Sequence, residues 1–419
     1  MPTGFHLLIA AQFASALADN ALLIVTMALL HERGMPPWWA PILKFGFTIS
    51  YVVLAPFVGP LADALPKARL MAWMNGVKVL GVVALLTGMH PVAAFAVVGF
   101  GAAAYAPAKY GLITELVLAQ RLVAANGWLE VTVVCAALLG AVLGGLLVSP
   151  WLLGSSPVAA VQLALNSVRL LEESLLSVSL LVLLGGYALA GVLNLGVPDS
   201  GARYPASQLN PITLVREFRQ ANLILWRDRD GGLSLAVTTI FWGLGATLQF
   251  AVLRWADDVL KLPLNEAAYL QAAVAVGVVI GACAAGRWVP LARAKNMLVA
   301  GVLLGLLLPV IAVSADLKLA IPLLVLVGAV GGLLVVPLNA LLQHRGCMRL
   351  SAGRSIAVQG FNENASILAM LAGYAALLWL DLPVVALLAG FGVAIAAAMA
   401  ALMWRERWRN SNEAALAVP

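Results

Sequence analysis

Twelve long apolar stretches follow one another along the chain, and this repeated pattern most limits what the chain can fold into. The stretches fall at residues 6–30, 41–62, 70–88, 92–118, 123–149, 174–196, 233–256, 266–289, 296–314, 318–343, 354–379 and 382–404. A membrane-spanning helix needs about 20 mostly apolar residues. Only 11% of the residues are charged, whereas soluble domains carry roughly 25%. The sequence therefore predicts an all-α membrane protein with twelve transmembrane helices in two six-helix, pseudo-symmetric halves.

The longest polar connection separates the first six stretches from the last six. We expect an N-terminal half at 1–196, a linker at 197–232, a C-terminal half at 233–404 and a tail at 405–419. Within the linker, Asn210 can cap a helix that starts at Pro211, with apolar residues between arginines. We interpret this segment as a helix at the membrane interface, and a solvated linker remains the alternative.

The distribution of basic residues predicts the orientation. Seventeen of the 25 Lys and Arg residues fall in connections and the tail on the side of the N-terminus. Five fall on the other side, namely Arg33, Arg169, Arg254, Lys261 and Lys318. Because basic loops stay in the cytoplasm, both termini are expected there. The basic residues are too dispersed for a nucleic-acid surface, and the scattered His and Cys residues predict no metal site and no cofactor.

Polar side chains inside the apolar stretches are the candidate substrate-binding residues, because charges in hydrocarbon are costly without a wet cavity or a partner. They are Asp19, Asn20, Lys78, Lys109, Tyr110, Glu130, Asn339, Gln359, Asn362 and Glu363. No cation lies beside Asp19 in the sequence, so we interpret Asp19, Lys109 and Glu130 as one polar centre. As alternatives, Lys109 and Glu130 could pair to lock two helices, and Asn339 and Gln359 could form hydrogen bonds between helices.

The connection between the second and third stretches contains a recognisable motif. Residues 59–69 resemble the G-x-L-A-D-R-x-G-R-K signature of the major facilitator superfamily, with departures at Ala64 and Pro66. The residues that carry over form a candidate conformational latch: Gly59, Asp63, Lys67 and Arg69. The corresponding connection at 286–295 keeps basic residues but has no acid, so we expect only one latch.

Five segments resemble a narrower family, the lysophospholipid transporters of Gram-negative inner membranes. These segments are residues 11–23, 102–111, 125–130, 335–343 and 357–364. The resemblance implies a multi-pass inner-membrane flippase that moves lysophosphatidylethanolamine and lysophosphatidylglycerol from the outer to the inner leaflet by alternating access without ATP. It also implies a functional partner, an acyltransferase/acyl carrier protein synthetase that reacylates the lipid. We expect a monomer.

The chemistry of such a substrate suits the candidate residues. Lys78 or Lys109 can bind the phosphate as a point charge, and Asp19, Glu130 or Glu363 can bind the ammonium. Small residues at i+4 spacing permit close helix contact and could form a lateral seam for the acyl chain. They are Ala136, Gly140 and Gly144 in the fifth stretch and Gly277, Gly281 and Ala285 in the eighth. Tight packing without a lipid path is the alternative.

Other functions remain to be weighed against lipid transport. A proton-coupled exporter of drugs or small metabolites would use one of the same carboxylates as a proton site. An enzyme is not expected, because no histidine begins an H-x-x-x-x-D motif and no Gly-Lys dipeptide supports a P-loop. A receptor or structural role is the remaining alternative.

Overall fold

The computed structural model describes residues 3–36, 39–166, 173–202, 204, 210–262, 264–380 and 382–416, and every regular element in these ranges is helical. Eleven helices within the described ranges are long and apolar enough to cross a membrane. A further helix, α14 (Ala352–Trp379), has 28 residues and is also long enough, but polar residues interrupt its first half. The predicted all-α membrane fold is confirmed. Arg169, Arg203 and linker residues 205–209 lie outside the described ranges.

The helices form two compact units that cross the boundary between the sequence halves. Unit 1 contains Met1–Leu118, Thr132–Ile224 and Gly346–Asn364. Unit 2 contains Ala119–Val131, Leu225–Arg345 and Ala365–Pro419. The first turns of one N-terminal helix thus belong to unit 2, and residues 346–364 from the C-terminal part of the chain belong to unit 1. Each unit is described by itself below.

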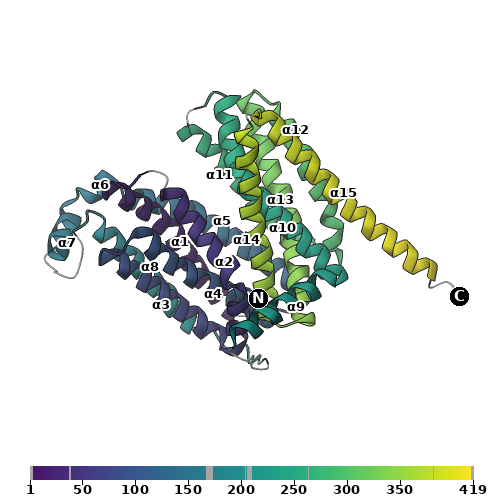
Figure 1. Ribbon diagram of the computed structural model, residues 1–419, viewed down its shortest axis with the longest axis horizontal. Helices are drawn as coiled ribbons and strands as arrows, with labels where there is room; N and C mark the ends of the chain where they lie inside the picture. Colours follow the sequence, from purple (N-terminus) through teal and green to yellow (C-terminus); the bar gives the residue numbers. More distant parts are fainter. Residues whose placement is uncertain are drawn as a thin grey trace. The chain divides into compact units, whose positions relative to one another are not determined.

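Unit 1 is a bundle built around α1, α3, α4 and α8 (Figure 1). Its helices are α1 (Thr3–Glu32), α2 (Trp39–Ala64), α3 (Lys67–Leu86), α4 (Pro91–Leu116), most of α5 (Leu122–Leu147), α6 (Pro150–Leu153), α7 (Ser156–Asn166), α8 (Ser177–Leu195), most of α9 (Pro211–Arg227) and the first part of α14. Leu22, Val82, Val98 and Tyr187 are buried in its core. The short helices α6 and α7 were not expected from the sequence, and Ser149 begins α6 by accepting a hydrogen bond from the Leu152 amide.

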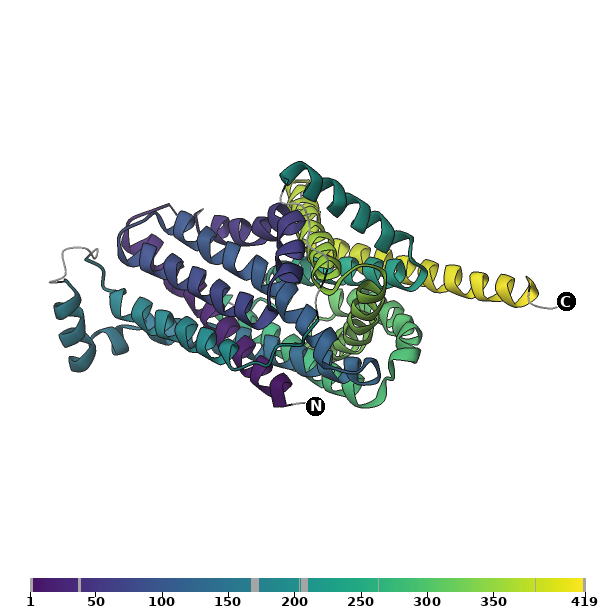
Figure 2. The ribbon, with the colours of Figure 1, turned by 90° about the horizontal axis from the view of Figure 1, so that it is seen from below.

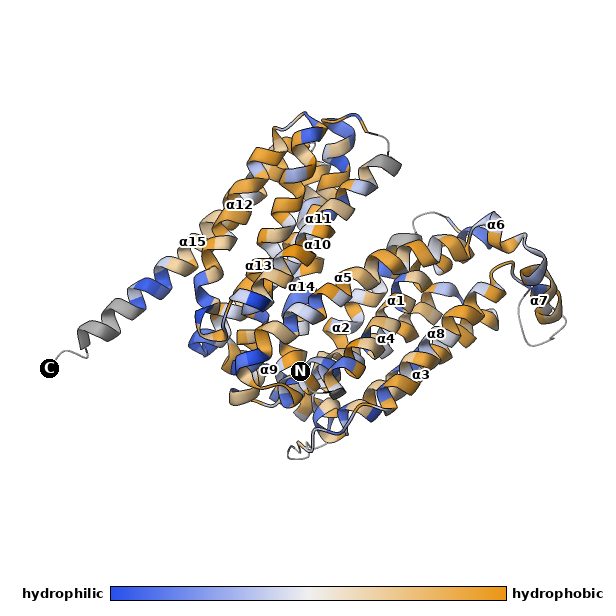
Figure 3. Cartoon of the chain, turned by 180° about the vertical axis from the view of Figure 1, so that it is seen from behind, coloured by the Kyte–Doolittle hydropathy of each residue, from blue (hydrophilic) through white to orange (hydrophobic). Residues whose placement is uncertain are grey.

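Unit 2 is a second bundle, in which α12 and α15 pack along each other (Figures 1 and 2). Its elements are η1 (Ala119–Arg121), α10 (Arg229–Asp258), α11 (Leu264–Trp288), η2 (Leu291–Met297), α12 (Leu298–Ala312), most of α13 (Leu317–Arg349), the second part of α14 and α15 (Val384–Leu416). Helix α15 continues beyond residue 404, so the described part of the expected tail is helical. Hydrophobic residues cover the bodies of these helices, and hydrophilic residues gather towards helix ends (Figure 3).

The linker contains the helix that its sequence predicts. The Asn210 side chain accepts a hydrogen bond from the Ile212 amide at 3.0 Å, and α9 starts at Pro211. Leu214 and Ala221 face the interior, whereas Ile212 and Val215 are exposed. Helix α9 is therefore amphipathic and packs by one face only.

The glycine stripes of α5 and α11 pack inside their own units. A β-carbon added at Gly140 would lie 2.7 Å from the Leu17 carbonyl oxygen of α1, and one at Gly144 would lie 2.7 Å from the Ile24 β-carbon. Added β-carbons at Gly277 and Gly281 would overlap the backbone of α13. Close packing therefore explains these glycines, and the lateral seam stays a prediction.

The packing of α11 on α13 predicts different outcomes for two glycines in unit 2. Gly281→Ala should lower the melting temperature, because its methyl group would overlap the Ala329 carbonyl and overpacking costs about 1–3 kcal/mol. Gly245→Ala is the matched control in α10, where an added β-carbon meets no atom within 4 Å. Thermal unfolding in detergent measures both. An unchanged melting temperature with lost transport in Gly281→Ala would contradict the packing role and favour the seam.

Candidate functional site

A polar cavity in unit 1 brings together side chains from α1, α2, α3 and α4. Its volume is about 60 Å³. The residues that line it are Gln12, Ser15, Ala16, Asp19, Tyr51, Lys78, Ala102, Tyr105, Ala106 and Lys109. Gln12, Ser15 and Asp19 share a face of α1 because they follow the i, i+3, i+7 spacing of a helix. The cavity is large enough for water or a small polar group.

The cavity contains a buried ion pair between α1 and α3. Lys78 Nζ lies 2.7 Å from Asp19 Oδ2 and 2.9 Å from Oδ1, and it also donates to Ser15 Oγ at 3.0 Å. The Lys78 side chain is 1% exposed, while 19% of the Asp19 side chain remains accessible from the cavity side. In the sequence, no cation lies beside Asp19. The structure corrects the inference that Asp19 lacks a cationic partner, because Lys78 reaches it from another helix, 59 residues away in the chain.

Aromatic side chains complete the surroundings of this pair. The Tyr187 hydroxyl donates to Asp19 Oδ1 at 2.8 Å. Lys78 Nζ lies 5.3 Å from the Tyr105 ring centroid and 5.5 Å from the Tyr187 ring centroid, within the range of a cation–π interaction. Tyr187 was not among the sequence candidates, because a tyrosine in an apolar helix gives no signal of its own.

The remaining N-terminal candidates lie in different places. Lys109 lines the cavity, and its Nζ lies 4.4 Å from the centroid of the neighbouring Tyr110 ring. Asn20 instead donates to the Ala16 carbonyl within α1 and faces Gly140. Glu130 is 7% exposed and belongs to unit 2, whereas Asp19 and Lys109 belong to unit 1. Unit 1 by itself thus brings together two members of the predicted trio.

The candidates from the C-terminal part of the chain form local contacts. Within unit 1, Gln359 donates to Glu363 Oε1 at 2.8 Å along α14. Asn362 donates to Asn222 of α9 at 2.9 Å. Asn339 is 5% exposed in α13 of unit 2. Gln359, Glu363 and Asn362 thus bridge helix turns or neighbouring helices. None of the C-terminal candidates lines the α1–α4 cavity.

Unit 2 contains a buried amide pair that the sequence does not predict. Asn126 and Gln343 each donate to the other's side-chain oxygen, at 2.8 and 2.9 Å. The two residues are 217 positions apart. In the sequence, each amide only falls near the end of an apolar stretch. That position does not reveal which residue each amide pairs with.

The motif residue Asp63 contacts the start of α14 within unit 1. Its carboxylate accepts hydrogen bonds from the Ser351 hydroxyl, from the Gly353 amide at 2.8 Å and from the Arg354 amide at 3.3 Å. These amides belong to the first turn of α14, where backbone N–H groups lack partners within the helix. A carboxylate there is favoured by the hydrogen bonds and by the helix dipole. Asp63 of α2 therefore caps α14 from outside.

Gly59 lets α2 approach α14 closely enough for this contact. A β-carbon added at Gly59 would lie 3.0 Å from Arg354 Cα and 3.0 Å from the Ala357 β-carbon. The glycine predicted to permit close helix approach is thus located at such an approach. Arg69, the last residue of the predicted latch, is exposed on α3.

Lys67 forms a second buried pair next to Asp63. Its Nζ lies 2.7 Å from Glu115 Oε1 and 4.8 Å from the centroid of the Tyr204 ring. The Tyr204 hydroxyl donates to the same Glu115 oxygen at 2.9 Å. Burial and the neighbouring Glu115 charge raise the pKa of Tyr204 above its usual value, which keeps the phenol protonated as a donor. Glu115 was not among the sequence candidates.

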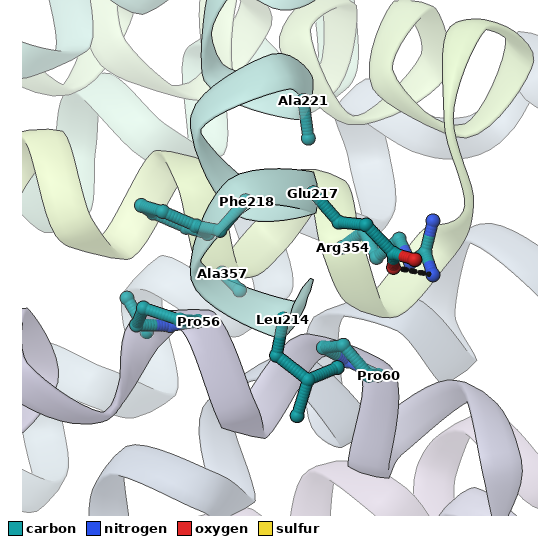
Figure 4. A pocket seen from close by; sticks show the side chains of 9 residues that line it. Pro56, Pro60, Leu214, Glu217, Phe218, Ala221, Arg354 and Ala357 are labelled. Carbon is teal, nitrogen blue, oxygen red and sulfur yellow. Dashed lines mark hydrogen bonds and ion pairs between the residues drawn. The ribbon is translucent and has the colours of Figure 1, made fainter. Parts of the chain in front are cut away.

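Helix α9 covers the contact between α2 and α14. Leu214, Phe218 and Ala221 of α9 face Pro56 and Pro60 of α2 and Ala357 of α14 around a small pocket (Figure 4). Glu217 pairs with Arg354 at 2.8 Å, as the dashed line in the figure shows. Helix α9 therefore contacts the same first turn of α14 that Asp63 caps.

Unit 2 contains an ion-pair cluster that the sequence did not predict. Lys295 contacts Asp230 at 2.9 Å and Glu406 at 2.7 Å, and Glu406 also contacts Arg229 at 3.1 Å. The expectation of a single latch rested on the missing acid in residues 286–295, and it stays a prediction. The acids come instead from α10 and α15, which local sequence cannot reveal.

A further ion pair in unit 2 joins Arg345 to Asp228, the residue that precedes Arg229 and Asp230 of this cluster. Asp228 caps the start of α10 by accepting from the Gly231 amide and also binds Arg345 through two hydrogen bonds, at 2.8 and 3.0 Å. A carboxylate that binds a guanidinium through both oxygens is a strong, directional contact. Asp228 thus joins α10 to α13 within unit 2.

Comparisons with known proteins agree with this architecture. The Major Facilitator Superfamily matches residues 7–362. Two solved structures share the fold: a bacterial homologue of the iron transporter ferroportin (TM-score 0.71, 15% identity, 96% of this chain and 99% of that chain) and the E. coli fucose:proton symporter FucP (TM-score 0.68, 15% identity, 95% and 98%). At these identities the likeness concerns the fold alone.

Two curated relatives are much more similar in sequence. The lysophospholipid transporter LplT of Escherichia coli O1:K1 is 40% identical over 406 residues, which is 96% of each chain. The protein of the same name from Shigella flexneri matches to the same extent. Both names describe transporters, in agreement with the expectation that this chain is not an enzyme. The chain belongs to the lysophospholipid transporter family of the Major Facilitator Superfamily.

Proposed function

We propose that this protein moves lysophospholipids from the outer to the inner leaflet of the bacterial inner membrane by alternating access without ATP. The observation that carries the proposal is the Asp19–Lys78 pair in a cavity that Lys109 also lines. A buried charge persists inside a membrane protein when a partner or a wet cavity compensates it. Here one carboxylate and two ammonium groups surround the same space.

This set of charges is complementary to a phospholipid headgroup. Lysophosphatidylethanolamine carries a phosphate and an ammonium, and lysophosphatidylglycerol carries the phosphate alone. We infer that Lys78 and Lys109 bind the phosphate and that Asp19 binds the ammonium. In the absence of lipid, Lys78 and Asp19 neutralise each other, and the headgroup exchanges these contacts for its own.

The direction of transport follows from removal of the product. Without ATP, net movement requires a lower chemical potential of the lysolipid on the receiving side. The acyltransferase/acyl carrier protein synthetase expected as functional partner would supply that difference by reacylating the lipid in the inner leaflet. In this arrangement both termini are expected in the cytoplasm, the side on which most basic residues lie.

Helix α9 fits the inner surface of the membrane in this arrangement. Its exposed face combines Ile212, Val215 and Leu223 with Arg216 and Arg219. Apolar side chains that alternate with arginines favour the boundary between acyl chains and anionic headgroups. The helix would hold the start of α14 near that boundary through Glu217 and Arg354.

The Asp63 contact is proposed as the latch of the alternating cycle. Three hydrogen bonds converge on one carboxylate, one from the Ser351 hydroxyl just before α14 and two from amides of its first turn. Such a contact forms only when α2 and the start of α14 are adjacent, so it favours the state in which they are. We infer that this state is closed to the cytoplasm.

The direct test is uptake of labelled lysophosphatidylethanolamine by spheroplasts that express the chain, compared with an empty vector. Uptake above the control supports the function, and no difference contradicts it. The same assay with an uncoupler tests the alternative of proton-coupled export. Uptake that stops when the proton gradient collapses would favour that alternative.

The headgroup assignment predicts different effects for two substitutions. Asp19→Asn should reduce uptake of the ethanolamine lipid more than uptake of the glycerol lipid, because only the former has an ammonium. Lys109→Ala should reduce uptake of both, because both carry the phosphate. Asp257→Asn, at an exposed position of α10, is the matched control for loss of a carboxylate. Equal losses of both lipids in Asp19→Asn would exclude the ammonium contact.

A double substitution separates binding from stability. Lys78→Met alone should lower the melting temperature, because removing one partner of a buried pair costs about 3–5 kcal/mol. Adding Asp19→Asn should restore stability but leave uptake low. If the double variant transported at the native rate, the pair would serve only to join α1 and α3.

The latch predicts that Asp63→Asn slows transport while the protein stays folded. An amide has a single acceptor oxygen and no charge, so it loses part of the contact with the α14 backbone. Cysteines introduced on the cytoplasmic side should become more reactive to a thiol reagent. Unchanged flux together with unchanged reactivity would remove the latch role.

A further inference from the structure

Gln12 is a buried amide that lines the cavity, with no hydrogen-bond partner in the part of the chain that the structure describes. Its side chain is 1% exposed and lines the cavity with Asp19 and Lys78. Neither its oxygen nor its nitrogen has a hydrogen-bond partner among the described residues. A buried polar group left unsatisfied costs about 1–3 kcal/mol. An amide kept in this position therefore points to a ligand group.

A second polar group of the cavity has an explanation within the protein. The Tyr105 hydroxyl also lacks a partner within hydrogen-bond distance. Asn194 of α8 lies close enough to interact with it, and both Asn194 side-chain atoms are available. A small movement pairs these two groups with each other.

The position of Gln12 relative to Asp19 suggests which part of the lipid it meets. The two residues are seven positions apart on one face of α1, which is a rise of about 10 Å. In a lysophospholipid the ammonium, the phosphate and the glycerol follow one another in that order. With the ammonium at Asp19 and the phosphate at Lys78, the glycerol extends towards Gln12.

We propose that the Gln12 amide binds the free glycerol hydroxyl and thereby selects lysophospholipids. This inference rests on the proposed function. The hydroxyl can donate to the amide oxygen and accept from the amide nitrogen, so one group satisfies both. In a diacyl lipid the same position is an ester, which cannot donate and carries a second chain. Losing this hydrogen bond disfavours the diacyl lipid relative to the lysophospholipid, because the buried Gln12 amide is then left unpaired.

The test compares lysophosphatidylethanolamine with an analogue in which hydrogen replaces the glycerol hydroxyl, at the same acyl chain. The native full-length chain in spheroplasts should take up the hydroxyl lipid about tenfold to a hundredfold faster. Gln12→Leu should lose this preference while its melting temperature stays equal or rises, because an unsatisfied amide is removed. Gln220→Leu, at an exposed position of α9, is the matched control and should keep the preference.

The outcomes separate the inference from the function on which it rests. If the native chain transported both lipids equally, the hydroxyl contact would be wrong and the proposed function would stand. If the native chain transported neither lipid, the proposed function itself would fail. If Gln12→Leu did not accumulate in the membrane, Gln12→Met would replace it in the same comparison. A variant of Gln12 that retained the full preference would overturn the inference.

Discussion

The cost of polar groups in hydrocarbon organises this structure. Because lipid offers no hydrogen bonds, each polar side chain in a membrane helix must find a partner inside the protein or face a hydrated space. The fold meets this condition in unit 1 with the Lys78–Asp19 and Lys67–Glu115 pairs, and in unit 2 with the mutual amide contact of Asn126 and Gln343. Against this background an unsatisfied amide such as Gln12 is informative, since folding alone gives no reason to keep it.

Helices and helix starts depend on local sequence pattern and could be predicted. Contacts between residues that are distant in the chain could not. Apolar length predicted the helices, and Asn210 with Pro211 predicted the start of α9. The motif at 59–69 identified Asp63 but could not name the α14 backbone as its partner, because that contact spans 290 residues. Likewise, Asp19 and Lys78 were both candidates, yet their pairing requires the register of α1 against α3. The orientation of the helices and the headgroup contacts remain predictions.

The two charged regions at helix ends differ in chemistry. In unit 1, Asp63 binds backbone amides, so no second charge is released when the contact breaks; the freed amides can bind water at the helix end. In unit 2, Asp228 and Glu406 bind Arg and Lys side chains through several hydrogen bonds. Separating those groups would leave opposite charges to be solvated on both sides. The Asp63 contact is thus better suited to repeated opening, whereas the unit 2 pairs suit a permanent join between helices.

The size of the cavity also constrains how a lipid can use it. A volume of about 60 Å³ holds only a few water molecules, so it accepts part of a headgroup but no acyl chain. An acyl chain in the bilayer is already in an apolar medium and gains little by moving against apolar side chains. The headgroup faces the opposite situation, because crossing hydrocarbon without partners is costly for its charges. On the proposed function, the protein therefore needs to compensate only the headgroup, and charges at Asp19, Lys78 and Lys109 beside the Gln12 amide do so while the chain stays in lipid.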